Sequence, residues 1–232
     1  MPLAVLSGGA AQGLVKAMAP DLAAHSGAAV AGTYGAVGAM KHLLIAGAPA
    51  DLLILTRAII ADLEASGHVV PGSARDIGRV RTAIAVRRDD PLPDVTSAAL
   101  LKDALRAADA IYVPDTRQST AGIHIARMLA ALGIADTIEG TLREFPNGAA
   151  AMSALAASRS ARPIGCTQLT EILGTEGVAV VRPLPAEFEL ATVYTAAVAM
   201  RAASPELAHR FAALLTGSTA AERRSRAGFD VE

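Results

Sequence analysis

The chain has 232 residues, with 21 Lys and Arg against 22 Asp and Glu, so its net charge is close to zero. This balance lacks the basic excess typical of nucleic-acid-binding proteins, and no apolar run reaches the roughly 18 residues that a membrane span needs. Cys166 is the single cysteine, which excludes an intrachain disulfide and a cysteine metal cluster. We therefore expect no nucleic acid partner and no membrane insertion.

Predicted strands and helices alternate along the chain. Continuous apolar runs predict strands, and apolar residues spaced three or four apart predict helices. Strands are expected at 3–6, 28–33, 52–55, 79–86, 110–113, 142–145, 163–166, 178–181 and within 188–200, and helices near 14–22, 37–44, 57–66, 96–107, 121–132, 148–158, 168–173, 205–215 and 219–227. The wholly apolar run at 52–55 is typical of a parallel strand covered on both faces. The alternation predicts an α/β protein.

The stretch from Asp115 to His124 lies between a buried strand and an amphipathic helix. Ser119 or Thr120 is a suitable N-cap, and Gly122 lets a ligand approach the backbone. Free N–H groups and the helix dipole favour an anion at such a junction, and Arg117 adds a bidentate positive charge. The alternative interpretation is an ordinary capped helix start with an exposed arginine.

Five strand-to-helix junctions carry small, hydroxyl-bearing or amide residues. They are Ser7-Gly8-Gly9, Thr33-Tyr34-Gly35, Arg117 to Gly122, Pro146-Asn147-Gly148 and Cys166-Thr167-Gln168. In open parallel sheets, ligands bind outside the carboxyl ends of the strands. Two junctions fall in the first half of the chain and three in the second, so we expect two lobes to line one cleft with hydrogen-bond donors.

Several motifs carry a family resemblance: the opening Leu3–Gly9, the block Ala46–Leu52, Thr120–Ile123 and the terminal Gly228-Phe229. The chain resembles the molybdate-binding proteins, type II periplasmic binding proteins that deliver oxyanions to ABC transporters. The resemblance implies two Rossmann-like α/β lobes with a ligand cleft between them, joined by two crossing strands. Carried over, lobe 1 is 1–80 plus 195–232 and lobe 2 is 81–194, with the crossings at 80–87 and 188–200.

The same resemblance implies a small anionic ligand and an ABC-transporter membrane subunit as partner. No cofactor is expected, and no metal either, because the histidines lack the spacing of a metal site. The family holds its oxyanion with neutral donors, whereas this chain has Gly-Gly and Tyr-Gly at the first two turns and introduces Arg117 and Gln168. An arginine fork and an amide suit a planar carboxylate better than a tetrahedral oxyanion. The predicted ligand contacts are Ser7, Gly8, Gly9, Tyr34, Gly35, Arg117, Ser119, Thr120, Ala121, Gly122, Asn147, Gly148, Thr167 and Gln168.

An enzymatic alternative comes from Ile164–Glu171, Gly177-Val178 and Pro183–Glu187. These segments resemble a branch of the same superfamily that includes aconitate isomerase, which moves a double bond in a tricarboxylate. Proton abstraction beside a carboxylate needs a positioned base, and the candidates are His124 and Glu171. Each also has a structural interpretation, as a packed histidine or a solvated helix residue.

The N-terminus bears on location. Met1-Pro2 runs directly into the first predicted strand, without a positive segment, a long apolar segment or a cleavage site. We expect a cytoplasmic protein if Met1 is native, and a periplasmic one if a signal peptide has been removed.

Overall fold

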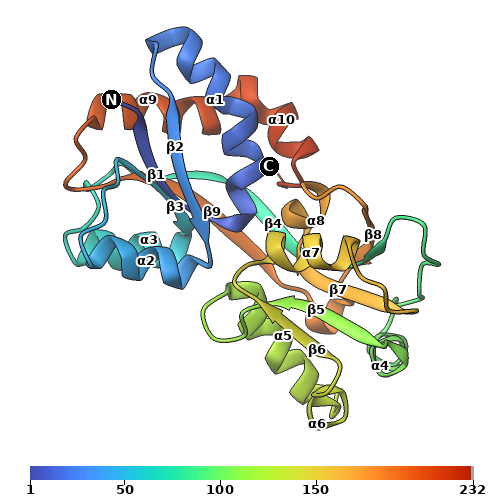
Figure 1. The fold of residues 1–232 in the computed structure, drawn as a ribbon. Helices are drawn as coiled ribbons and strands as arrows, with labels where there is room; N and C mark the ends of the chain where they lie inside the picture. Colours follow the sequence, from blue (N-terminus) through green and yellow to red (C-terminus); the bar gives the residue numbers. More distant parts are fainter. Residues whose placement is uncertain (231–232) are drawn as a thin grey trace. The chain divides into compact units, whose positions relative to one another are not determined.

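The computed structural model describes residues 1–230 and divides into two compact units. The first unit holds residues 1–80 and the segment from Thr192 onward, and the second holds 81–191 (Figure 1). No helix within residues 1–230 combines the length and apolar character needed to cross a bilayer.

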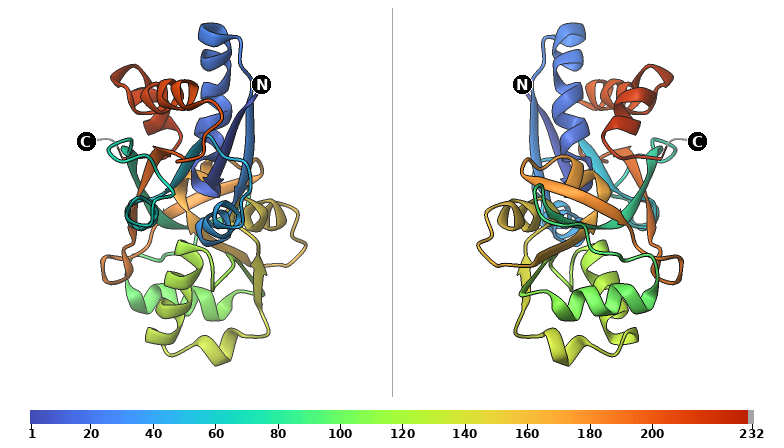
Figure 2. Two further views of the ribbon diagram at one scale, coloured as in Figure 1. Left: turned by 90° about the vertical axis from the view of Figure 1, so that its left-hand side faces the viewer. Right: turned by 90° about the vertical axis from the view of Figure 1, so that its right-hand side faces the viewer.

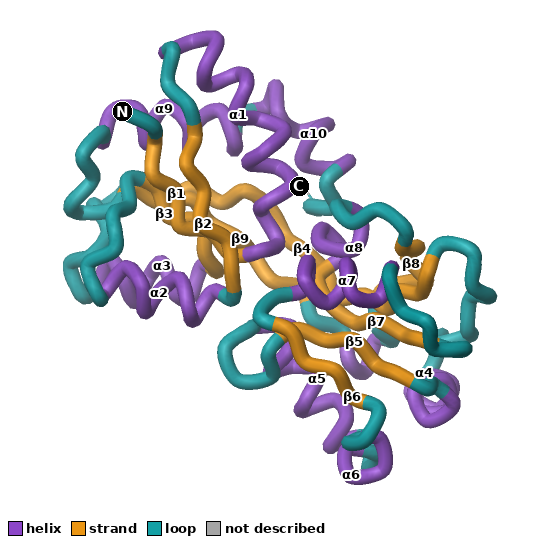
Figure 3. The backbone as a smooth tube through the Cα atoms, in the orientation of Figure 1, coloured by secondary structure: helices purple, strands orange, loops and turns teal. Residues whose placement is uncertain are grey.

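The first unit is a sheet with helices on both faces. Its elements are β1 (Leu3–Gly8), η1 (Gly9–Ala11), α1 (Gln12–Ser26), β2 (Val30–Gly35), α2 (Val37–Ile45), β3 (Leu52–Thr56), α3 (Arg57–Ala65), the start of β4 (Arg75–Arg87), β9 (Ala191–Val198), α9 (Pro205–Thr216), η3 (Ser218–Ala220) and α10 (Ala221–Arg226). The strand order is β2-β1-β3-β9-β4. Helices α2 and α3 lie on one face, and α1 and α9 lie on the other (Figure 3).

Strand β3 is the centre of this unit, and each of its five residues is buried. It is parallel to β1 and antiparallel to β9, so a strand lies along each of its edges. The helices on the two faces of the sheet cover it from both sides. The sequence prediction of a strand covered on both faces is confirmed. The last two helices, α9 and α10, lie beside the first helix, α1, in this unit (Figure 2).

The second unit has its own sheet. Its elements are the rest of β4, α4 (Ala98–Ala107), β5 (Ala110–Pro114), α5 (Thr120–Ala131), α6 (Ala135–Ile138), β6 (Leu142–Phe145), α7 (Gly148–Ala156), β7 (Pro163–Gln168), α8 (Leu169–Leu173), β8 (Val178–Pro183) and η2 (Ala186–Phe188). The strand order is β4-β7-β5-β6, and β8 pairs with β4. Strand β5 is parallel to β6 and β7, whereas β4 is antiparallel to β7 and β8.

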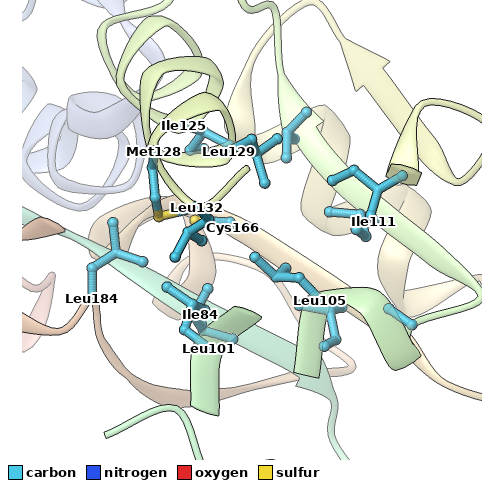
Figure 4. Close-up of a cluster of buried hydrophobic side chains, with 14 of the residues drawn as sticks. Ile84, Leu101, Leu105, Ile111, Ile125, Met128, Leu129, Leu132, Cys166 and Leu184 are labelled. Atoms are coloured by element: carbon cyan, nitrogen blue, oxygen red, sulfur yellow. The ribbon is translucent and has the colours of Figure 1, made fainter. Parts of the chain in front are cut away.

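Residues of β4 and β7 alternate between two hydrophobic cores. Ile84 and Cys166, which are paired across the strands, pack with Ile125 of α5 in the larger core (Figure 4). Ala83 belongs to the other core, which contains Met152 of α7. Successive residues of a strand point to opposite faces. Helices α5 and α7 therefore cover opposite faces of this sheet.

Strands β1, β2 and β7 are among those that continue further than predicted, and this corrects the positions of several candidate residues. Ser7 and Gly8 pair with Tyr34 and Gly35 in parallel register, and Gln168 pairs with Thr82. The prediction that these segments are turns after the strands is wrong, because backbone pairing with a neighbouring strand continues through them. The short helix α6 was not predicted, and the run 188–200 is strand only over Ala191–Val198.

Candidate functional site

The carboxyl end of β1 carries Ser7, Gly8 and Gly9, all of them buried. The Ser7 hydroxyl donates to the carbonyl of Gly8 at 2.8 Å. A side chain at Gly8 would lie 2.8 Å from Val37 Cγ1 and 3.1 Å from Tyr194 Cε1. Glycine here lets these side chains pack directly on the backbone, so the structure gives Gly8 a packing role.

Tyr34 and Gly35 end the neighbouring strand β2. The Tyr34 ring turns back along the strand, so that its hydroxyl lies over Gly32, where a Cβ would overlap it. Partial burial raises the pKa of the Tyr34 hydroxyl. Gly35 is buried, and a Cβ there would lie 2.8 Å from Met40 Cε. The Tyr34 hydroxyl is therefore set back from the carboxyl end of β2.

In the second unit, the loop between β5 and α5 is held by hydrogen bonds from its backbone N–H groups to a side chain of the same loop. Asp115 Oδ1 accepts hydrogen bonds from the N–H groups of Arg117 and Gln118, at 2.7 and 2.8 Å. A Cβ on Gly122 would lie 2.6 Å from the carbonyl oxygen of Pro114 and overlap that of Asp115. Gly122 therefore allows the first turn of α5 to lie directly against this loop, which fixes where the helix begins.

Helix α5 begins with unused donors. Ser119 is the N-cap and accepts a long hydrogen bond, 3.5 Å, from Gly122 N–H. Within residues 1–230, the N–H groups of Thr120 and Ala121 have no acceptor, and the exposed Arg117 guanidinium makes no hydrogen bond or ion pair. These donors and the helix dipole favour an anion at this end of α5.

One turn further along α5, His124 Nε2 lies 2.8 Å from the carbonyl oxygen of Phe188. A carbonyl only accepts, so Nε2 donates this hydrogen bond. His124 thus links α5 to η2.

On the α7 face of the sheet, Glu171 is a buried carboxylate surrounded by donors. Its Oε2 accepts from Thr167 Oγ1 at 2.6 Å. Burial raises the pKa of Glu171, while hydrogen bonds from Thr167 and from the backbone N–H groups of Gly148, Gln168 and Ala149 oppose that rise.

The glycine at the start of α7 makes this arrangement possible. A Cβ on Gly148 would lie 2.5 Å from Glu171 Cδ. Asn147 caps the same helix by accepting from Ala150 N–H at 2.9 Å. The N-terminus of α7 therefore already has a partner in the carboxyl group of Glu171, which accepts from the N–H groups of Gly148 and Ala149.

On the α5 face, the polar groups at the same strand end have no such partners. Gln168 is 2% exposed and Thr82, its partner across β4, is 1% exposed. Within residues 1–230, neither Nε2 nor Oε1 of Gln168, nor Oγ1 of Thr82, makes a hydrogen bond. Buried polar side chains are hydrogen-bonded in the large majority of cases. These three atoms therefore lack a hydrogen-bond partner within the described residues, as does Oγ1 of the buried Thr170 in the same unit.

The predicted site residues thus fall into separate groups. The first unit carries Ser7, Gly8, Gly9, Tyr34 and Gly35. In the second unit, one group surrounds the start of α5: Arg117, Ser119, Thr120, Ala121, Gly122 and His124. On the α7 face, Gly148 and Thr167 donate to Glu171 and Asn147 caps α7, whereas Gln168 faces the α5 side. Thr82 was missed, although a threonine two residues before a buried isoleucine was a visible signal of an inward-facing hydroxyl. No cluster of His, Cys, Asp or Glu suited to a metal occurs within residues 1–230.

Comparisons with known proteins agree with this fold. The family model for bacterial extracellular solute-binding proteins matches residues 3–230. An aconitate isomerase from Pseudomonas sp. is 27% identical over 226 residues, covering 95% of this chain and 84% of that protein. The structure of the Azotobacter vinelandii periplasmic molybdate-binding protein superposes with a TM-score of 0.83 at 19% identity, covering 99% of both chains.

A substrate-binding domain assigned to a molybdenum ABC transporter of Clostridium difficile gives a TM-score of 0.69 at 15% identity, covering 100% of this chain and 99% of that one. The fold is that of the type II periplasmic binding proteins, as the sequence predicted. With a family model that matches nearly its whole length, the chain belongs to the bacterial extracellular solute-binding proteins.

Proposed function

We propose that this solute-binding protein takes a small organic carboxylate as its ligand and serves an ABC transporter. The observation that carries the proposal is the buried pair Gln168 and Thr82, whose side-chain polar atoms have no partner within residues 1–230. A buried polar group without a hydrogen bond costs about 1–3 kcal/mol. A ligand that supplies the missing bonds recovers this free energy on binding.

The charge for such a ligand would come from Arg117 and the first turn of α5. The Arg117 guanidinium is exposed and unpaired within residues 1–230, and the N–H groups of Thr120 and Ala121 lack acceptors. A guanidinium presents two parallel N–H groups that match the two oxygens of a planar carboxylate. This favours an organic carboxylate over the tetrahedral molybdate of the Azotobacter relative.

Calorimetric titration of the full chain tests the ligand class. We expect succinate or citrate to bind at micromolar concentration, with molybdate and sulfate at least tenfold weaker. Tight binding of molybdate with no carboxylate binding would reject the proposal.

The role of Arg117 has its own test. Loss of a charged partner costs roughly 2–5 kcal/mol, and because Arg117 is exposed we expect Arg117→Ala to weaken binding by about 30-fold, at the low end of that range. Arg127→Ala removes another exposed arginine of α5 and is the matched control. A loss below threefold in Arg117→Ala would mean that neutral donors alone hold the anion.

Five residues of the first unit are also predicted to contact the carboxylate: Ser7, Gly8, Gly9, Tyr34 and Gly35. Ser7→Ala removes one hydroxyl that donates only to the adjacent carbonyl, so folding should be preserved. We expect about fivefold weaker carboxylate binding, the magnitude of one hydrogen bond. An unchanged dissociation constant would limit the ligand contacts to the second unit.

The second candidate function is isomerisation of aconitate, which the 27% identity to aconitate isomerase favours. His124 is the better candidate base, because its Nδ1 has no hydrogen-bond partner within residues 1–230, whereas Glu171 already accepts from Thr167 and from backbone N–H groups. Proton NMR of aconitate incubated with the protein would show a second isomer, and His124→Ala would abolish its appearance. An unchanged spectrum at high protein concentration would reject isomerisation and leave ligand binding as the only proposed function.

A further inference from the structure

The side-chain amide of Gln168 needs two different hydrogen-bond partners, one acceptor and one donor. Its Nε2 is a donor and its Oε1 is an acceptor, and both are buried without a partner within residues 1–230. The Thr82 hydroxyl beside it can donate or accept. A hydrogen bond between Gln168 and Thr82 would satisfy one side of the amide and leave the other unmet, so a complete solution requires an outside group.

An anion that carries only acceptors meets half of this demand. Sulfate, molybdate or a simple dicarboxylate can accept from Gln168 Nε2 and from Thr82 Oγ1. None of them can donate to Gln168 Oε1, which would then face negative oxygen atoms. The amide therefore discriminates against ligands that have no donor.

A hydroxyl group on the carbon next to a carboxylate provides both partners side by side. The carboxylate oxygen accepts from Nε2, and the hydroxyl donates to Oε1. An ammonium group would also donate, but it needs a carboxylate partner, and the buried Glu171 lies on the other face with its hydrogen bonds already made. Asp115, in the loop between β5 and α5, already accepts two backbone N–H groups.

We propose that the ligand is a 2-hydroxycarboxylate, and that Gln168 is the residue that selects it through its hydroxyl. This inference rests on the proposed carboxylate-binding function. It adds a feature that the fold and charge do not require, because Arg117 and the α5 N-terminus would hold any carboxylate equally well.

Matched pairs of ligands distinguish carboxylate binding from selection of the hydroxyl group. We would titrate the full chain calorimetrically with malate against succinate, and with citrate against tricarballylate, since the members of each pair differ by one hydroxyl. The hydroxy member should bind about tenfold or more tightly, because a site built to pair a hydroxyl is left with an unmet acceptor when it is missing.

Gln168→Met keeps the length of the side chain and removes both polar functions. It should reduce the preference within each pair to less than threefold, while the deoxy member still binds. A melting temperature at least equal to that of the wild type would show that the variant folds.

Three outcomes would overturn the inference, and they are distinguishable. Equal binding of both members would mean that water satisfies the amide, with carboxylate binding intact. A preference that persists in Gln168→Met would assign selection to another residue. Binding of neither member would reject the carboxylate function itself, and the inference with it.

Discussion

At the carboxyl end of β7, two adjacent residues meet opposite environments. Thr167 faces α7, where its hydroxyl donates to Glu171 and the carboxylate is surrounded by further donors. Gln168 faces the α5 side, where its amide and the hydroxyl of Thr82 have no partner within residues 1–230. Both faces are equally closed to solvent, since all four side chains are buried. Burial alone therefore does not mark a ligand site; the presence or absence of partners distinguishes the two.

The difference has an energetic meaning. On the α7 face, the hydrogen bonds are made during folding, so those residues contribute to the stability of the unit. On the α5 face, the same kind of residue lowers stability until something binds. Natural binding sites often trade stability for function in this way. Mutations that remove these polar groups should consequently lower the free energy of unfolding on the α7 face and raise it on the α5 face.

The largest expected effect is on the α7 face, at Gly148. A methyl group there would overlap the Glu171 carboxylate and the Thr167 hydroxyl, which cannot both move without losing their hydrogen bonds. Gly148→Ala should lower the free energy of unfolding by about 3 kcal/mol or more, measured by urea denaturation. Gly140→Ala is the control, because a Cβ at Gly140 has no atom within 4 Å. Equal stability of the two variants would show that the packing around Glu171 and Thr167 can adjust to a methyl group at Gly148.

A second prediction compares two threonines, each replaced by isosteric valine. Thr167→Val removes a hydrogen bond to a buried carboxylate and should destabilise the protein by roughly 1.5–3 kcal/mol. Thr82→Val removes a hydroxyl without a partner and should stabilise it by roughly 0.5–1 kcal/mol. Both values come from denaturation without ligand. If both variants lose stability by similar amounts, the contrast between the two faces is wrong.

The pH dependence of stability should sharpen the α7 side of the comparison. Burial raises the pKa of Glu171 above its ordinary value of 4.5. Well below pH 4.5, Glu171 is protonated in both the folded and the unfolded state, so no ionised carboxylate has to be buried on folding. As pH rises above 4.5, the unfolded state ionises more easily than the folded state, so the contribution of Glu171 falls until the folded pKa is passed and is then constant.

Glu171→Gln cannot ionise and serves as the reference. The free energy of unfolding of the wild type, minus that of the variant, should therefore be larger at pH 4 than at pH 8. A difference that grows with pH would mean that the surrounding N–H groups outweigh the burial of the charge. The effect is expected to be smaller than those of the two preceding predictions, because donors and burial act in opposite directions on Glu171.

Much of the fold could be predicted from the sequence because apolar patterns report which faces are buried. The run 52–55 identified a central strand, and the strand at Leu142–Phe145 matches its predicted bounds. The ends of β1, β2 and β7 were predicted too early. Serine, tyrosine, glycine and glutamine are typical turn residues, and only the register with a neighbouring strand shows that pairing continues through them.

The candidate site could be predicted only in part, for a similar reason. Residue types at strand ends drew attention to Thr167, Gln168 and the start of α5, which stay predicted contacts. The sequence could not show which polar groups already have partners within the chain. Glu171 and Gly148 were predicted as a base and a ligand contact, and no sequence pattern indicated that the Gly148 N–H donates to the Glu171 carboxyl group. Thr82 lies 86 positions from its strand partner Gln168, a pairing that no local pattern encodes.

The smallest expected effect concerns Cys166, which marks where the open polar region should end. It lies two residues before Gln168 on the same face of β7 and belongs to the apolar core beneath α5. Burial raises the pKa of the Cys166 thiol to about 12. At pH 8 roughly one molecule in ten thousand would then carry the reactive thiolate. A disulfide reagent should therefore leave the native protein unlabelled for hours and label it fully in concentrated urea. If space around Gln168 extended down to Cys166, labelling would be fast and a saturating carboxylate would slow it. That result would mean that the α5 face holds a deep channel instead of a small polar patch above a closed core.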